Sequence, residues 1–122
     1  LQVQPTEMIK EATEGSKSLL INEVKEYILE RIEKEDLTID AIASHLKMSR
    51  TKFYNKWKSV IGEAPTVFIE AVRMEKAHEL LESGKYPVGT IPEMIGLKDV
   101  KNFRNRYKEY FGITPKESIK KK

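Results

Sequence analysis

Residues 38–61 read TIDAIASHLKMSRTKFYNKWKSVI, and their pattern predicts two helices joined by a short turn. We expect the first helix over 39–46, with the hydroxyl of Thr38 as its N-cap. A two-residue corner follows at 47–48, and Ser49 is placed to cap the second helix. The rest of the chain is expected to support this helix-turn-helix.

The second helix is expected to present two unlike faces. Its apolar residues recur at spacings of three and four and form one buried stripe: Phe53, Trp57, Val60 and Ile61. The opposite face carries Thr51, Tyr54, Asn55 and Lys58, flanked by Arg50, Lys52 and Lys56. Cations in the first turn of a helix are unfavourable by roughly 0.3–1 kcal/mol each, so an external anion such as a phosphate is indicated. The alternative is an ordinary solvated face in a lysine-rich chain.

Length and composition restrict the class of protein. The 122 residues are expected to form one domain with a single modest core. The absence of cysteine excludes a disulfide scaffold and thiolate chemistry, and it fits a reducing, cytoplasmic setting. No apolar run approaches the roughly 20 residues of a membrane span, and no signal peptide opens the sequence. Because Leu1 stands where a methionine would begin a complete protein, we expect an excised piece of a longer chain.

The net charge of +3 conceals two parts of opposite sign. Residues 1–40 hold five Lys and Arg against ten Asp and Glu, whereas residues 41–122 hold 17 against nine. The basic part coincides with the helix-turn-helix and everything that follows it. A basic surface on a small domain indicates an anionic partner, most commonly nucleic acid.

The N-terminal segment is expected to consist of a linker and a supporting helix. Residues 1–17 are polar and show no sustained period, so they are expected to be the linker. The helix is predicted from Ser18 to about 34–36. Its apolar residues recur every three to four positions: Leu20, Val24, Tyr27, Ile28 and Ile32.

A long helix is predicted after the helix-turn-helix. Gly62 is placed to end the preceding helix in the left-handed region, Pro65 to open the long one, and Gly84 to stop it after Ser83. Its apolar row is Val67, Ala71, Met74, Ala77 and Leu81, widened by Phe68, Val72 and Leu80. So broad a stripe indicates a strut buried between two lobes.

The last third of the chain repeats the helix-turn-helix. Four apolar residues lie 49 positions after Ile39, Ile42, Leu46 and Met48: Val88, Ile91, Ile95 and Leu97. Five more lie 50 positions after Phe53, Trp57, Ile61, Gly62 and Pro65: Phe103, Tyr107, Phe111, Gly112 and Pro115. A repeat that includes the glycine and the proline is hard to obtain from generic helix packing, so a second lobe is predicted.

The second copy has its own turn, cap and outward face. Gly96 stands at the turn, and Asp99 is placed to cap a helix over about 100–111. The outward face of that helix would carry Lys101, Asn102, Asn105 and Lys108, flanked by Arg104 and Arg106. Thr114 and Glu117 form a capping box that opens a short terminal helix.

Proline shortens the first helix of the second copy. Because Pro92 is tolerated only in a first turn, we expect this helix to start at Thr90, with a capping box between Thr90 and Glu93 and a length of about a turn and a half. The second lobe is therefore expected to be held less rigidly than the first.

Over about residues 19–119 the sequence resembles the DNA-binding domain of the AraC/XylS family of bacterial transcription regulators. The residues that carry the resemblance in the first half are Leu37-Thr38, Ile42-Ala43, Leu46, Met48-Ser49, Trp57-Lys58 and Gly62. In the long helix they are Arg73, Ala77 and Leu80-Leu81. Near the C-terminus they are Gly96-Leu97, Phe103, Tyr107-Lys108 and Phe111-Gly112-Ile113-Thr114-Pro115.

The resemblance implies an all-α fold of about seven helices. Two helix-turn-helix subdomains, 18–62 and 88–122, would be joined by a linking helix at 65–83. Two recognition helices, at about 50–61 and 100–111, would enter successive major-groove segments of DNA. The residues expected to contact DNA are Arg50, Thr51, Lys52, Tyr54, Asn55, Lys58, Lys101, Asn102, Arg104, Asn105 and Lys108.

The resemblance also implies the partners. These are double-stranded DNA, RNA polymerase, and covalently linked sensor or receiver domains such as those of hybrid two-component regulators. No cofactor and no metal are expected. The chain departs from the family pattern at Pro92, at Ser118-Ile119, and at Asn55 and Asn105, where many members carry arginine. We therefore expect the first recognition helix to carry more sequence information than the second.

Two other classes of function were weighed against DNA binding. An enzyme is disfavoured, because His45 and His78 lie on different predicted helices and no phosphate-binding glycine loop is present. The second class is a helical module that binds an acidic protein or dimerises through the helix at 18–34. The duplication favours DNA, because two equivalent basic faces suit the repeating groove of a duplex.

Overall fold

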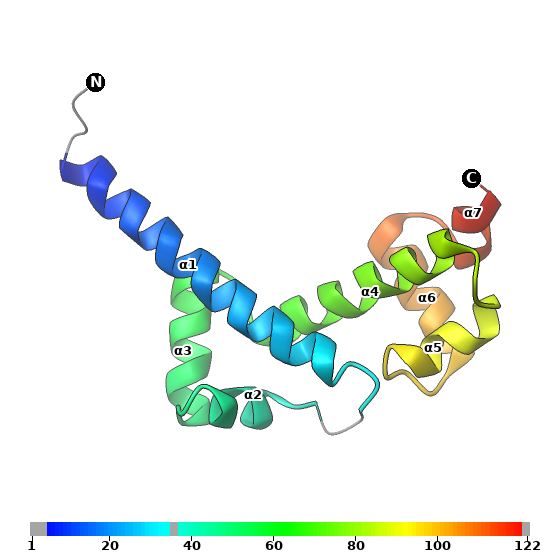
Figure 1. The fold of residues 1–122 in the computed structure, drawn as a ribbon, viewed down its shortest axis with the longest axis horizontal. Coiled ribbons are helices and arrows are strands. Elements are labelled where there is room, and N and C mark those ends of the chain that lie inside the picture. The colour runs from blue at the N-terminus through cyan, green and yellow to red at the C-terminus, as the bar shows by residue number, and fades with distance from the viewer. Residues whose placement is uncertain (1–4, 35–36, 121–122) are drawn as a thin grey trace.

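The computed structural model describes the backbone of residues 5–34 and 37–120, and side chains between residues 15 and 119. Three short ranges lie outside the described residues: 1–4 in the expected linker, 35–36 at the expected end of the first helix, and 121–122 in the second subdomain. The described chain is all α, as expected, and forms two lobes joined by one long helix (Figure 1). None of its helices is both long and apolar enough to cross a membrane.

The helices follow one another without any strand in the described part of the chain. They are α1 (Pro5–Glu30), α2 (Ile39–His45), α3 (Arg50–Ile61), α4 (Pro65–Ser83), the short 3-10 helix η1 (Val88–Thr90), α5 (Ile91–Met94), α6 (Val100–Phe111) and α7 (Pro115–Lys120). The first lobe consists of α1 to α3, and the second of η1 and α5 to α7 (Figure 1).

Helix α1 begins and ends earlier than expected. It starts at Pro5, so residues 5–17, expected to be a linker, are helical, and it ends at Glu30 rather than near 34–36. Seven of these 13 residues are Glu, Lys, Met or Ala, whose intrinsic propensity favours a helix without any apolar period. The five apolar residues expected to face the core are all buried: Leu20, Val24, Tyr27, Ile28 and Ile32.

The first helix-turn-helix forms as the sequence predicts. The Thr38 hydroxyl accepts a hydrogen bond from the Ala41 N–H, and the Ser49 hydroxyl accepts one from the Lys52 N–H, each at 3.1 Å. Between the helices, Lys47 has a φ of 59°. Both caps and the corner are therefore confirmed.

The second copy reproduces the first in its hydrogen bonds. The turn of the first copy is closed by the Met48 N–H, which donates to the Ala43 carbonyl at 2.9 Å. In the second copy the Leu97 N–H donates to the Pro92 carbonyl at 2.8 Å, 49 positions later. Helix α6 spans the residues 50 positions after α3, so the extra residue lies between the turn and the cap.

The expected capping box at Thr90 is wrong. Thr90 already has helical dihedral angles, φ −90° and ψ −18°, and its hydroxyl donates to the Pro87 carbonyl at 2.8 Å. An N-cap needs an extended backbone, and here η1 precedes α5 and makes Thr90 part of a helical turn. Pro92 lies in the first turn of α5, where it removes no helical hydrogen bond.

Helix α4 is buried on more than one side, as expected of a strut. It contacts α1 and α3 of the first lobe and α5, α6 and α7 of the second. One assignment was wrong: Val67 is 49% exposed, whereas Ile69 is buried. Two residues apart on a helix lie on nearly opposite sides, and Ile69 shares its side with the buried Pro65 and Val72.

A chain of polar side chains joins three helices of the second lobe. The Tyr107 hydroxyl of α6 lies 2.9 Å from Nδ1 of His78 on α4 and 2.7 Å from the hydroxyl of Ser118 on α7. Ser118 and Tyr107 are both buried. The histidine therefore has an ordinary structural role, and Ser118 supplies a second polar partner for the Tyr107 hydroxyl.

Candidate nucleic-acid interface

The outward face of α3 is open to solvent. Five of its six expected contact residues are exposed: Arg50, Thr51, Lys52, Asn55 and Lys58. The sixth, Tyr54, is half-buried and packs against the core. The face is held in place by Phe53 and Trp57, whose side chains are completely buried.

Helix α6 offers a matching face. Its five expected contact residues are all exposed: Lys101, Asn102, Arg104, Asn105 and Lys108. Phe103 and Tyr107 are completely buried beneath them, and the Asp99 carboxylate caps the helix by accepting from the Asn102 N–H at 3.1 Å. The structure thus leaves these residues exposed on each helix, around the sides that Phe53 and Trp57, or Phe103 and Tyr107, do not occupy.

The first turns of these two helices carry no carboxylate. Helices α2, α5 and α7 each have one there, from Asp40, Glu93 and Glu117, where it stabilises the positive end of the helix dipole. Helices α3 and α6 have none in the first turn, although both are basic; α4 has none either, and the Asp99 carboxylate stands at the N-cap of α6. A helix N-terminus flanked by cations is suited to an anion supplied from outside.

Only a weak contact competes for Arg50. Its guanidinium lies 3.6 Å from the Asp40 carboxylate, and the two side chains are 61% and 65% exposed. Ion pairs this exposed contribute about 0–1 kcal/mol and are screened by salt. Arg50 can therefore exchange Asp40 for a phosphate at little cost in free energy.

Arg106 does not flank the outward face of α6 as expected. Its guanidinium turns toward α4 and pairs with Glu70, with Nε donating to Oε2 at 2.9 Å and Nη2 contacting Oε1. The two residues lie 36 positions apart, so no local spacing could predict this contact. The one signal in the sequence was that position 106 borders the buried stripe of Phe103 and Tyr107.

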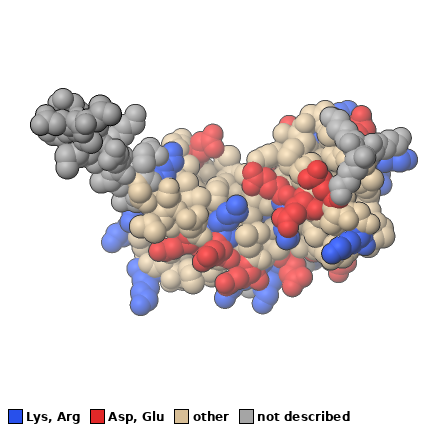
Figure 2. All heavy atoms as spheres, turned by 45° about the horizontal axis from the view of Figure 1, so that its top comes forward, with Lys and Arg blue, Asp and Glu red and all other residues tan. Residues whose placement is uncertain are grey.

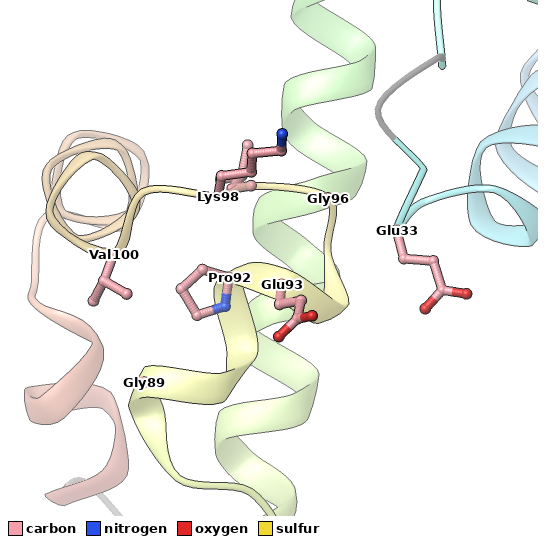
Figure 3. A pocket seen from close by; sticks show the side chains of 8 residues that line it. Glu33, Gly89, Pro92, Glu93, Gly96, Lys98 and Val100 are labelled. Atoms are coloured by element: carbon pink, nitrogen blue, oxygen red, sulfur yellow. The ribbon is translucent and has the colours of Figure 1, made fainter.

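The hollow between the end of α1 and the second lobe is unsuited to DNA. Figure 3 shows Pro92 and Glu93 on α5, Gly96 in the turn, and Glu33, which follows α1, on the other side of the hollow. The carboxylates of Glu33 and Glu93 would repel phosphates, although Lys98 also lines this hollow. On another face of the molecule, acidic side chains gather over the middle and basic ones stand mainly along the lower and outer edges (Figure 2).

Comparison with known proteins agrees with this geometry. A family model described as a helix-turn-helix domain matches residues 42–121. Histidine kinase P4 of Formosa agariphila is 28% identical over 98 residues, which cover 80% of this chain and 7% of that protein. The chain therefore spans a small part of the length of this relative.

Two solved structures have the same fold. The crystal structure of a transcriptional regulator with an AraC-type DNA-binding domain from Chromobacterium violaceum superposes with a TM-score of 0.76 at 25% identity, over 86% of this chain and 93% of that one. The DNA-binding domain of AdpA, solved in complex with a target DNA, gives 0.69 at 26% identity, over 80% and 86%. By its family match and its fold, the chain belongs to the AraC-type helix-turn-helix DNA-binding domains of transcription regulators.

Proposed function

We propose that the chain binds double-stranded DNA sequence-specifically as part of a bacterial transcription regulator, with α3 and α6 in successive major-groove segments. The observation that carries this proposal is the repeated helix-turn-helix, whose two equivalent helices expose cations and asparagines over a buried aromatic base. The family and the fold are those of transcription regulators, not of enzymes. The DNA complex of the AdpA domain supports the same assignment.

The exposed side chains suggest a division of roles. Asparagine can form two hydrogen bonds with adenine in the major groove, so Asn55 and Asn105 would read bases. Lysine and arginine at the helix N-termini and along the rims would contact phosphates, which position the domain without specifying a sequence. Thr51 and Tyr54 would make apolar contacts with thymine methyl groups, Tyr54 from its half-buried position.

The match to part of a longer relative supports a setting within a larger regulator. Residues 18–122 would form the DNA-binding unit, and residues 1–17 would connect it to a sensor or receiver domain, as the match to part of a histidine kinase suggests. The regulator would act in the cytoplasm, and RNA polymerase is the partner through which a protein bound at a promoter affects transcription.

A salt series with random-sequence DNA tests the proposal. Binding of the chain to a fluorescent duplex should weaken with salt with a log-log slope of about −0.9 per phosphate contact, so roughly −4 to −7 for five to seven contacts. Selection from a random pool should then yield a preferred site. Failure to bind any duplex at low salt would favour a module that binds acidic proteins instead.

A further inference from the structure

We propose that the ion pair between Glu70 and Arg106 fixes the orientation of the second recognition helix and thereby the spacing between the two DNA segments that the domain accepts. This inference rests on the proposed DNA-binding function. It assigns positioning roles to two residues outside the two exposed faces.

The geometry of the pair is suited to fixing an orientation. Two parallel contacts join the planar guanidinium to the carboxylate, and the side chains of Arg106 and Glu70 are 30% and 32% exposed. Bidentate charge-assisted pairs are directional, and partial burial protects them from screening by salt. This pair therefore differs from the exposed pairs elsewhere on the described surface.

Apolar packing alone would leave the rotation of α6 less well defined. Burial of Phe103 and Tyr107 is strongly favourable, but the hydrophobic effect has no direction. Arg106 follows Asn105 directly and lies one turn after Asn102. Holding Arg106 against α4 consequently fixes the direction in which these two asparagines point.

Glu70 stands where the two lobes meet. It lines a hollow together with Leu37, Ile39 and Arg50 of the first lobe, and Arg106 of the second lobe lines the same hollow. The pair therefore holds the second recognition helix to α4 at the place where the first lobe lies beside it.

Arg73 adds a second polar contact from α4 to the second lobe. Its Nε donates to the Ile95 carbonyl at 3.1 Å, directly before the turn that leads to α6. Burial lowers the pKa of Arg73, the neighbouring charge of Arg106 lowers it further, and Glu70 opposes this. Glu70 thus lies between two guanidinium groups and offsets their mutual repulsion.

Loss of Glu70 would release Arg106 toward the DNA. A free guanidinium beside an occupied major groove favours a phosphate, and each added phosphate contact steepens the salt dependence by about 0.9. The Glu70→Gln variant should therefore bind random DNA more tightly and yet discriminate less between spacings. General destabilisation of the fold would weaken binding to all DNA instead.

The test measures spacing preference on a duplex selected by the wild-type chain from a random pool. Affinities are measured for this duplex and for versions with one or two base pairs inserted or deleted between the two contacted segments. In Glu70→Gln and in Arg106→Lys, which keeps the charge but not the bidentate fork, the preference should fall by roughly three- to tenfold. Glu79→Gln is the matched control, because Glu79 is an exposed carboxylate that pairs with Lys76 of the same helix, at 3.3 Å.

The possible outcomes distinguish a failure of this inference from a failure of the proposed DNA-binding function. If the wild-type chain selects no duplex, the proposed function is wrong and the inference falls with it. If it selects one, three results would overturn the inference alone. The wild-type chain could bind all spacings equally well, or Glu70→Gln and Arg106→Lys could keep the wild-type spacing preference. The third result is a loss of spacing preference in Glu79→Gln as large as in the other two variants. Should Glu70→Gln fail to fold, Arg106→Lys decides the matter.

Discussion

At the level of single residues, Gly96 lets the turn of the second lobe approach the backbone that follows α1. Its φ is 83°, and a Cβ built at this position would clash with the carbonyl oxygen of Ile32, which follows α1. Two features thus require glycine at this position: the left-handed backbone of the turn and the close contact with Ile32. Lys47, its counterpart in the first copy, meets the first requirement at a cost in strain.

We predict that Gly96→Ala destabilises the domain by more than about 2 kcal/mol, because conformational strain of roughly 1–2 kcal/mol is added to a backbone clash. Two glycines serve as controls. Gly112→Ala meets only the strain of a φ of 80°, and Gly89→Ala meets neither strain nor a neighbour. The free energies of unfolding in urea should rank Gly96→Ala as the least stable and Gly89→Ala as nearest to wild type. Equal losses for Gly96→Ala and Gly112→Ala would show that the contact with Ile32 can relax.

Asparagines and lysines on the two faces are expected to differ in what they recognise. Asn55→Ala should relax the preference at one base pair by about 1–3 kcal/mol, and Asn105→Ala should do so less, because α5, which supports the second lobe, has only four residues. Lys58→Ala and Lys108→Ala should weaken binding to all sequences alike. Affinities for a selected site and its single-base variants measure both effects. A greater loss of discrimination in Asn105→Ala would reverse the ranking of the two lobes.

At the level of helices, the sequence predicts what is locally determined. Thr38, Ser49 and Asp99 cap the helices as expected, because a cap depends on residues within three positions of it. The ends of α4 at Pro65 and Ser83 were predicted for the same reason. Periodicity could not show which side of α4 each lobe would cover, so Val67 was placed in the core and Ile69 was missed.

The candidate interface was predictable to the same extent. Exposure of the contact residues on α3 and α6 follows from helical period, and all of them are exposed as expected except Tyr54, which is half-buried. Contacts between distant elements were not predictable. Arg106 therefore appeared as a further basic residue of the face, whereas a carboxylate 36 positions away holds it against α4.

Helix α4 should be the most sensitive element to loss of buried volume. Met74 and Leu81 are 0% and 1% exposed, so replacing either by alanine should cost roughly 2–5 kcal/mol. Val67→Ala is the control on the same helix, because that side chain is half exposed and should cost much less. Thermal unfolding of the three variants gives the comparison. Wild-type melting temperatures for both Met74→Ala and Leu81→Ala would mean that α4 is not the strut.

The contact of α6 with α4 and α7 should make the fold sensitive to alkali. Burial raises the pKa of Tyr107, the hydrogen bond from Ser118 lowers it to a lesser extent, and Glu82 raises it. A phenol whose pKa is higher in the folded state contributes stability below the unfolded value of about 10, and this is lost as pH rises further. The free energy of unfolding should therefore decline above pH ~10, and less steeply in Tyr107→Phe. An identical decline in both proteins would contradict the assignment.

At the level of the whole molecule, charge and shape together orient the domain. The first 40 residues are acidic and include α1, whereas the residues that follow are basic and include both recognition helices. The hollow beside the end of α1 is lined by Glu33 and Glu93, so this side should face away from DNA. Long-range repulsion of the acidic part would favour encounters in which the recognition helices arrive first.

The stiffness of α4 leads to a prediction about the DNA itself. Two recognition helices on one face of a duplex must contact segments about one helical turn apart, roughly 34 Å or 10–10.5 base pairs, unless the DNA bends. Hydroxyl-radical footprinting on a selected duplex should therefore show two protected segments with that separation on one face. Inserting five base pairs between them should abolish the protection of one segment, because the insertion rotates that segment to the opposite face of the duplex.

An insertion of ten base pairs distinguishes a rigid strut from a flexible tether. This insertion returns the second DNA segment to the same face of the duplex but increases the separation of the two segments by about 34 Å. That increase exceeds the roughly 28 Å length of a helix of 19 residues such as α4. The second lobe is also held to this helix by Glu70 and Arg73, and α1 and α3 of the first lobe pack against it, so the lobes cannot separate to follow the DNA. We expect the ten-base-pair insertion to bind as weakly as the five-base-pair one. Recovery of the double footprint and of affinity at ten base pairs would show that the lobes move independently and that α4 does not set their separation.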